Sequence, residues 1–264
     1  ATRWALVEFA ERTPVLATQK LDGNQQPVFS LATGKILATG PEGLIHEFDA
    51  LTLAPLRTLG NASDSFVAVS ASSSSPWLVA GDATGGTTVI DLQTAAVTHH
   101  WSIHHGAVTN VLCDPAGHGF AAADAQGDVF WMPSLTATPT LIAKLGTSIT
   151  ALAFSPNGTR LAIGTASGKV LVYALDGTTV FDRQLGNFQV MALSFAPDKN
   201  ELWMGSRTIY VINPDNGLVL RSIDPRNGTC RDLRHDLDGS VIAGGWWRID
   251  RYREGEPTQS LALQ

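Results

Sequence analysis

A small residue returns about every 41 residues along this sequence, each time at the same place in a short apolar segment. The segments ILATGPEGLI, LVAGDATGGT, FAAADAQGDV, LAIGTASGKV, LWMGSRTI and VIAGGWWRI align on it. The aligned residues are Thr39, Gly81, Ala123, Gly164, Gly205 and Gly244, with successive spacings of 42, 42, 41, 41 and 39 residues. A second column, made of the turn glycines Gly34, Gly117, Gly158 and Gly239, follows the same period or its double. Two columns that share one period indicate a protein built from structural repeats.

Each repeat reads as four short strands, which we call A to D. In one repeat they are expected over 149–155, 159–165, 169–175 and 178–185. The turn between A and B contains Asn-Gly or Asp-Gly pairs, which tolerate the positive φ of a tight turn. Strands B and C carry apolar residues on both sides, so both faces of each small sheet must be buried by neighbouring sheets. Small residues in strand B let those neighbouring sheets approach closely.

A period of about 40–45 residues with four strands per unit predicts an all-β β-propeller. A helical solenoid would need a 3.6-residue period, and no long amphipathic helix is found. A single large β-sandwich would not produce the regular columns.

The segments VTNVLCDPAGHGFAAADAQGDVFWM and ITALAFSPNGTRLAIGTASGKVLVYAL are similar to the repeat of the WD-repeat propeller family. The resemblance covers almost the whole chain, but the repeats are degenerate. The Trp-Asp pair of that family becomes Phe48-Asp49 and Ile90-Asp91, and its Gly-His element survives at most as His104 or His105. The buried His–Asp network of the family is therefore expected to be largely absent. The segment VINPDNGLVLRSID also resembles the looser YVTN-type bacterial propellers.

We expect a single propeller domain over residues 1–264 with about seven blades, one of them incomplete. Residues 1–22 match strands C and D of a half blade, whose other strands would lie in a longer chain or come from another chain. Seven full blades need about 287 residues, more than the 264 present. The alternative is six blades, with the N-terminal hairpin closing the ring. The six full blades are expected at 26–59, 65–104, 107–145, 148–185, 188–224 and 229–264.

Charge and composition narrow the possible partners. The net charge is −6 and the pI about 5.6, which argues against nucleic-acid binding through a basic surface. No run of 18 apolar residues occurs, so membrane insertion is not expected. The chain begins at Ala1 without a signal-peptide pattern, and we expect a soluble protein, cytoplasmic or periplasmic, from which an upstream segment was removed. The two distant cysteines, Cys113 and Cys230, do not indicate a redox compartment.

The sequence contains no recognisable catalytic motif, and we predict no catalytic residue, metal or cofactor. The segment HEFDA at 46–50 begins like a zinc-binding H-E-x-x-H motif but ends in Ala50. An alternative is a propeller lactonase or hydrolase with a metal in the central channel. Its ligands would have to come from Asp64, Asp82, Asp124 and one of the histidines at 104 and 105.

The predicted topology places the B–C turns and the D–A loops on one face of the propeller. Loops on a rigid scaffold carry function, and arginine with aromatic residues is typical of protein interfaces. In the segment GGWWRIDRYR, the alternative is that the tryptophans cap the last blade and the arginines pair with nearby acids. We predict a non-catalytic scaffold that binds a protein partner, possibly as a subunit of a larger complex. The candidate contact residues are Glu42, Asp82, Asp124, Arg207, Trp246, Trp247, Arg248, His104 and His105.

Overall fold

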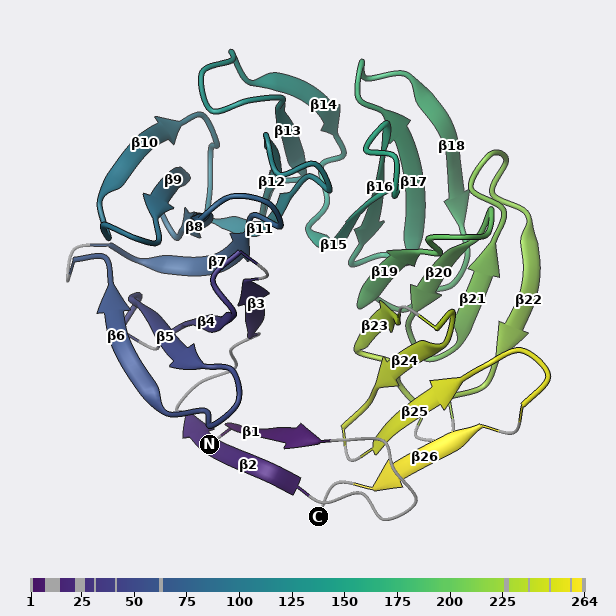
Figure 1. The fold of residues 1–264 in the computed structure, drawn as a ribbon. Helices are drawn as coiled ribbons and strands as arrows, with labels where there is room; N and C mark the ends of the chain where they lie inside the picture. The colour runs from purple at the N-terminus through teal and green to yellow at the C-terminus, as the bar shows by residue number, and fades with distance from the viewer. Residues whose placement is uncertain are drawn as a thin grey trace. The chain divides into compact units, whose positions relative to one another are not determined.

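A computed structural model describes residues 2–7, 15–21, 27–30, 32–40, 42–61, 64–225, 228–236, 238–246, 248–256 and 258–262. Every regular element among these residues is a β-strand (Figure 1). Twenty-four of the strands form six four-stranded sheets, and the remaining two form a separate two-stranded sheet. Neighbouring strands are consecutive in the sequence, so each four-stranded sheet is a simple meander.

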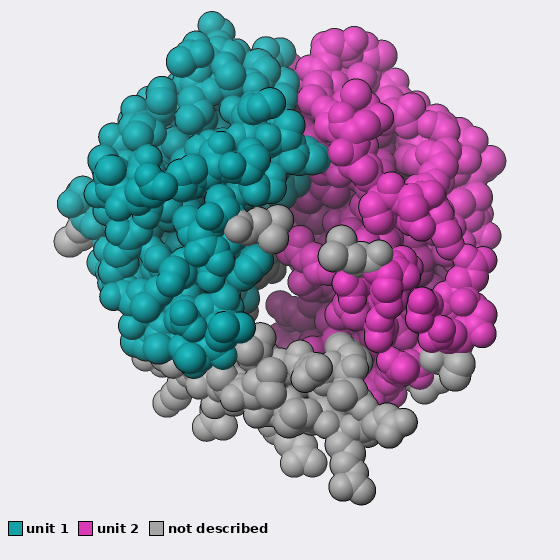
Figure 2. Space-filling view, in the orientation of Figure 1, with its two compact units in different colours: residues 1–140 teal, residues 141–264 magenta. Residues whose placement is uncertain are grey.

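The chain divides into two compact units, residues 1–140 and 141–264, with the boundary inside β14 (Figure 2). The sheets that begin in unit 1 are three. The first contains β3 (Val28–Ser30), β4 (Lys35–Thr39), β5 (Ile45–Asp49) and β6 (Pro55–Leu59). The second contains β7 (Phe66–Ala71), β8 (Trp77–Asp82), β9 (Gly86–Asp91) and β10 (Val97–Ser102). The third contains β11 (Val108–Cys113), β12 (Phe120–Asp124), β13 (Asp128–Met132) and β14 (Thr140–Lys144).

Unit 2 contains the other three four-stranded sheets. The fourth sheet contains β15 (Ile149–Phe154), β16 (Arg160–Thr165), β17 (Lys169–Ala174) and β18 (Thr179–Gln184). The fifth contains β19 (Ala192–Phe195), β20 (Leu202–Gly205), β21 (Ile209–Ile212) and β22 (Val219–Ile223). The sixth contains β23 (Asp232–His235), β24 (Val241–Gly244), β25 (Arg248–Tyr252) and β26 (Gln259–Ala262).

The leading expectation of seven blades is wrong, and six blades of four strands, the alternative, are present. The N-terminal strands β1 (Thr2–Val7) and β2 (Val15–Leu21) pair antiparallel with each other as a two-stranded sheet. Length is the physical reason: at about 41 residues per blade, a chain of 264 residues cannot supply a seventh set of four strands.

The core lies between successive sheets, where strands B and C are buried on both faces, as the sequence predicts. In β12 every residue is buried, whereas the outermost strand β22 is almost entirely exposed. Mixed clusters fill the space between neighbouring sheets. One of them joins Val170 and Val172 of the fourth sheet to Leu193 and Met204 of the fifth. The burial of these side chains removes apolar surface from water and supplies most of the stabilisation.

The small residues of strand B have the role that the repeat predicts. A Cβ added at Gly81 would lie 2.5 Å from Cγ1 of Val108, which begins the next sheet. At Gly164 the added atom would lie 2.4 Å from Cγ1 of Val190, again at the start of the next sheet. Contacts shorter than 3 Å are too close for carbon atoms, so glycine is required where the sheets approach each other most closely.

Candidate functional site

Two of the predicted contact residues, Glu42 and Asp82, lie in B–C turns of unit 1. Glu42 is exposed and pairs with His46, four residues further on. Asp82 is half-buried, and its Oδ1 accepts hydrogen bonds from the amides of Thr84, at 2.7 Å, and Gly86, at 2.9 Å. Burial acts to raise the pKa of Asp82, but the hydrogen bonds outweigh it and the pKa lies below its ordinary value. The carboxylate therefore closes its own turn.

His104 and Asp124 form a buried pair within unit 1. Nδ1 of His104 lies 3.3 Å from Oδ2 of Asp124, and both side chains are fully excluded from solvent. The other oxygen of Asp124 accepts from the amides of Gln126, at 3.0 Å, and Asp128, at 2.9 Å. Burial lowers the pKa of His104 although the Asp124 charge opposes that shift. One His–Asp link of the family type is therefore present, and we assign these two residues to loop stability rather than to partner contact.

His105 differs from its neighbour because its side chain is 77% exposed. Its Nδ1 lies 3.6 Å from Oδ2 of the buried Asp128. Of the two adjacent histidines, the structure therefore turns His104 inward and His105 toward solvent.

In unit 2, the predicted residue Arg207 stacks on an aromatic ring. Its guanidinium carbon lies 4.0 Å from the ring centre of Phe188. Arg207 belongs to the B–C turn after β20, and Phe188 belongs to the D–A loop before β19. Phe188 is 48% exposed, and Arg207 is exposed. This pair is a cation–π contact at the protein surface.

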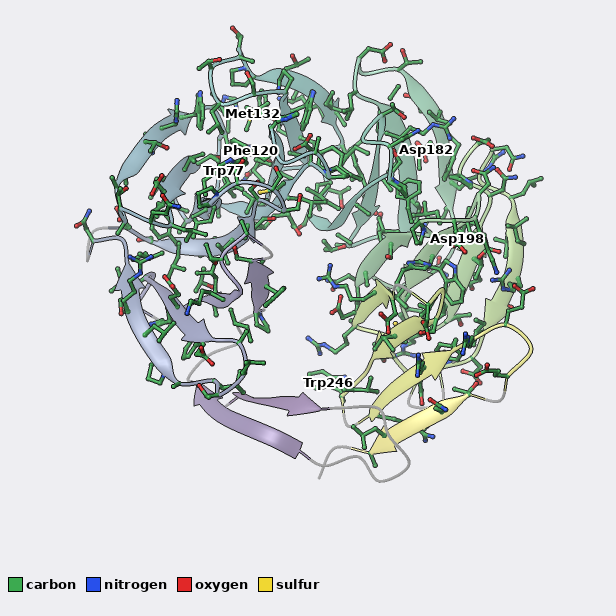
Figure 3. All side chains as sticks on the ribbon, in the orientation of Figure 1. Trp77, Phe120, Met132, Asp182, Asp198 and Trp246 are labelled. Carbon is green, nitrogen blue, oxygen red and sulfur yellow. The ribbon has the colours of Figure 1, made fainter. Side chains whose placement is uncertain are left out.

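The next sheet repeats this arrangement with the two residue types exchanged. The guanidinium carbon of Arg231, in the D–A loop, lies 3.9 Å from the ring centre of Trp246, in the B–C turn (Figure 3). Trp246 is 59% exposed. Trp247 lies outside the described residues. Arg248 is turned to the sheet, where its Nε donates to Asp250 Oδ1 at 2.8 Å, which matches the alternative expectation that the arginines here pair with nearby acids.

The loops that carry these two stacked pairs are bonded to each other through Ser206. The Ser206 hydroxyl donates to the carbonyl of Gln189 at 2.9 Å, beside Phe188. The Ser206 carbonyl accepts from the amide of Cys230 at 2.7 Å, beside Arg231. Because Ser206 directly precedes Arg207, both pairs belong to one continuous surface of unit 2. We call Phe188, Arg207, Arg231 and Trp246 the arginine–aromatic patch.

The patch is cationic. Among the residues that the structure describes, neither Arg207 nor Arg231 forms an ion pair with a carboxylate. The nearest acidic residue in sequence, Asp232, lies 3.4 Å from Nε of Arg234 instead. A guanidinium stacked flat on a ring keeps its N–H edge available for carboxylates or carbonyls. The patch therefore combines apolar area with unsatisfied donors.

Sequence reasoning missed two members of the patch, Phe188 and Arg231. Both lie in D–A loops whose importance was anticipated, but the residues considered there were others. The available signal was the complementary residue type in the neighbouring turn, because an arginine at 207 and a tryptophan at 246 each require a stacking partner.

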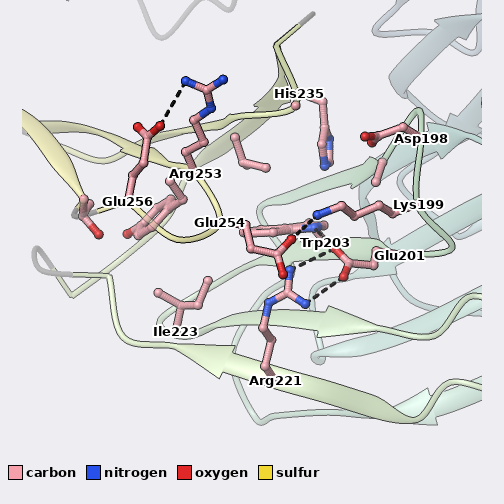
Figure 4. Close-up of a pocket in the computed structure, with 15 residues that line it drawn as sticks. Asp198, Lys199, Glu201, Trp203, Arg221, Ile223, His235, Arg253, Glu254 and Glu256 are labelled. Carbon is pink, nitrogen blue, oxygen red and sulfur yellow. Dashed lines mark hydrogen bonds and ion pairs between the residues drawn. The ribbon is translucent and has the colours of Figure 1, made fainter.

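Unit 2 also contains an intersheet cleft that the sequence did not predict. It lies between the fifth and sixth sheets and encloses about 410 Å³ (Figure 4). Its walls include Asp198, Glu201, Trp203, Arg221, His235 and Val241. Because these residues come from A–B turns and the starts of outer strands, the cleft lies at the opposite ends of the strands from the arginine–aromatic patch.

Two searches of the described residues bear on other functions. No group of three or more His, Cys, Asp or Glu side chains in the described ranges is placed to hold a metal ion. In the part of the chain that the structure describes, no helix is long and apolar enough to span a membrane. The metal-dependent enzyme remains an untested alternative.

Comparisons with known proteins agree on the fold. The family model "WD domain, G-beta repeat" matches residues 139–174. A comparison with curated proteins finds no match. Among 1787 matching chains of solved structures is the β-propeller domain of Cps50 (Swd1) from Myceliophteria thermophila. It is 15% identical, with a TM-score of 0.74 over 91% of this chain and 86% of that chain. So many matches at such low identity define a fold without singling out a function.

Proposed function

Because the chain is a WD-repeat-like β-propeller of six four-stranded blades, we propose that it is a non-catalytic scaffold that binds a protein partner through the arginine–aromatic patch. Propellers of this kind typically serve as protein-interaction scaffolds. The observation that carries the proposal is the pair of exposed cation–π contacts on adjacent, hydrogen-bonded loops.

Physical chemistry favours this surface over the other loops. Tryptophan and arginine are enriched among the residues that dominate binding energy at protein interfaces. Each arginine is already oriented by its ring, so less side-chain entropy is lost when a partner binds. The equivalent loops of unit 1 use their polar groups internally, as Asp82 and Asp124 do, and have fewer groups left to offer.

The test is affinity enrichment from a lysate of the source organism, followed by identification of the retained proteins. The variant Arg207→Ala/Trp246→Ala removes one member of each stacked pair. The matched control Arg183→Ala/Leu220→Ala removes an exposed arginine and an exposed apolar residue from the outer strands β18 and β22. We expect at least one protein that the wild type and the control retain and the patch variant loses. Retention of the same proteins by all three would refute the proposal.

A further inference from the structure

The intersheet cleft of unit 2 has the size of a binding site. Its volume of about 410 Å³ lies within the range of small-ligand pockets, about 300–1,000 Å³. All of its walls belong to the fifth and sixth sheets and the turns at one end of them. It is separate from the arginine–aromatic patch, which lies at the other end of the same strands.

Most charges around the cleft neutralise each other. Arg221 makes two parallel hydrogen bonds to Glu201, at 2.7 and 2.9 Å. Lys199 pairs with Glu254, and Nη1 of Arg253 lies 3.1 Å from Oε1 of Glu256 (Figure 4).

Asp198 is the exception. Its exposed carboxylate has no ion-pair partner among the residues described, although it lines the cleft. Because each of the other acidic groups has a cationic partner, one negative charge at the mouth of the cleft is not compensated. A positively charged ligand would supply that compensation.

His235 leaves a second group unsatisfied. Its Nδ1 lies 2.8 Å from the hydroxyl oxygen of Ser194, whereas its Nε2 is buried and has no hydrogen-bond partner among the described atoms. Burial lowers the pKa of His235 against the opposing charges of Asp198 and Glu201, so the ring is neutral at neutral pH. In the tautomer that donates from Nδ1 to Ser194, Nε2 is an acceptor. A buried acceptor without a donor is costly, and a ligand N–H would satisfy it.

The inner walls suit an aliphatic stem rather than a compact ion. Val241 and Trp203 are both at least nine-tenths buried, and Ile223 lines the outer part. The ring of His235 stands edge-on to Trp203, with 5.9 Å between the ring centres. Lysine and arginine side chains bury their methylene groups along apolar surface while the charged end stays with polar partners.

We propose that the intersheet cleft binds a lysine or arginine side chain from the surface of a partner protein, with Asp198 neutralising the charge and Nε2 of His235 accepting an N–H. This inference rests on the proposed function, because it assumes a protein partner. It adds a second contact point of opposite charge to the arginine–aromatic patch.

The probe is a short neutral peptide with one central arginine, titrated into ¹⁵N-labelled protein and followed by chemical-shift changes. Matched peptides carry lysine or glutamine at the same place, and free arginine and spermidine serve as small-molecule probes. We expect saturable shifts around Trp203 and His235 with the arginine or lysine peptide and none with the glutamine peptide. Equal shifts with all three peptides would overturn the proposal, and so would tighter binding of spermidine than of either basic peptide.

Two variants test the assigned roles. Asp198→Asn removes the unpaired charge, and we expect it to weaken peptide binding at least about fivefold, the effect of a rim charge worth about 1 kcal/mol. Asp224→Asn makes the same change at an exposed carboxylate in the loop after β22 and should bind as the wild type does. Unchanged affinity in Asp198→Asn contradicts the proposal. The patch variant Arg207→Ala/Trp246→Ala should bind the peptide normally, so failure at the cleft and failure at the patch are distinguished.

Discussion

The B–C turns of the two units use the same position in the repeat for opposite purposes. In unit 1, Asp124 sits at the end of β12 and accepts two backbone amides and a histidine in a site closed to water. In unit 2, the corresponding turns present Arg207 and Trp246 to solvent, each stacked on a residue of the neighbouring D–A loop. One turn is held by its own hydrogen bonds, and the others offer their polar groups outward.

This contrast separates stability from binding within one repeat. A buried carboxylate with three donors contributes to folding and has no capacity left for a partner. An exposed arginine on an aromatic ring contributes little to folding but keeps most of its donors. We therefore expect substitutions in the two kinds of turn to affect different measurements.

The largest expected effect is on the stability of unit 1. Asp124→Ala leaves the amides of Gln126 and Asp128 and the ring of His104 without their buried acceptor. We expect the free energy of unfolding to fall by about 2–4 kcal/mol, measured by urea denaturation. Asp91→Ala removes the same kind of turn acceptor from a less buried site and should cost clearly less. Equal losses would show that burial does not separate the two turns.

The second effect concerns the strands beneath the patch. A Cβ at Gly205 would lie 2.9 Å from Sγ and 3.1 Å from the carbonyl oxygen of Cys230. Gly205→Ala would therefore push apart the loops that carry Arg207 and Arg231, and we expect a loss of about 1–3 kcal/mol.

The matched control is Gly244→Ala in the next sheet. Its added atom would meet only Cβ of Asp232, at an ordinary 3.7 Å. We expect the unfolding free energy to change by less than about 1 kcal/mol, again in urea. If both alanine variants are equally stable, close approach of the sheets does not explain the small-residue column.

A smaller effect on stability is expected at the patch itself. Trp246→Ala removes a ring that is 59% exposed and one cation–π contact, which is worth at most about 1 kcal/mol at the surface. The urea midpoint should therefore move little, while partner retention is lost. A large loss of stability in this variant would place Trp246 in the support of the last sheet, the alternative that the sequence left open.

The period predicted the four-strand sheets well because each depends on a local pattern. The turn glycines Gly34, Gly117, Gly158 and Gly239 all have positive φ, as their place in A–B turns requires. The number of blades was less predictable, because a two-stranded N-terminal sheet and a half blade have the same local sequence pattern.

The candidate site could be predicted only in part. The turn positions of Arg207 and Trp246 follow from the repeat, but their partners Phe188 and Arg231 depend on how adjacent loops meet. The burial of His104 and the exposure of His105 are also set by packing, since the two residues are neighbours of one type. The intersheet cleft is formed by side chains of two sheets about 40 residues apart, so no local pattern reveals it.

The smallest expected effect is the reaction of the two buried thiols, which report on each unit separately. Burial raises the pKa of both Cys113, in unit 1, and Cys230, in unit 2, to about 12. Because the thiolate is the reactive form, both should resist alkylation at pH 8 in the folded protein and react fully in urea. Cys113 ends a strand, whereas Cys230 lies in a D–A loop beside the patch.

Since loops open at lower free-energy cost than core strands, Cys230 should react first as urea is added, and mass spectrometry of the labelled peptides would give the order. Earlier labelling of Cys113 would mean that unit 1, with its internally bonded turns, is the less stable of the two.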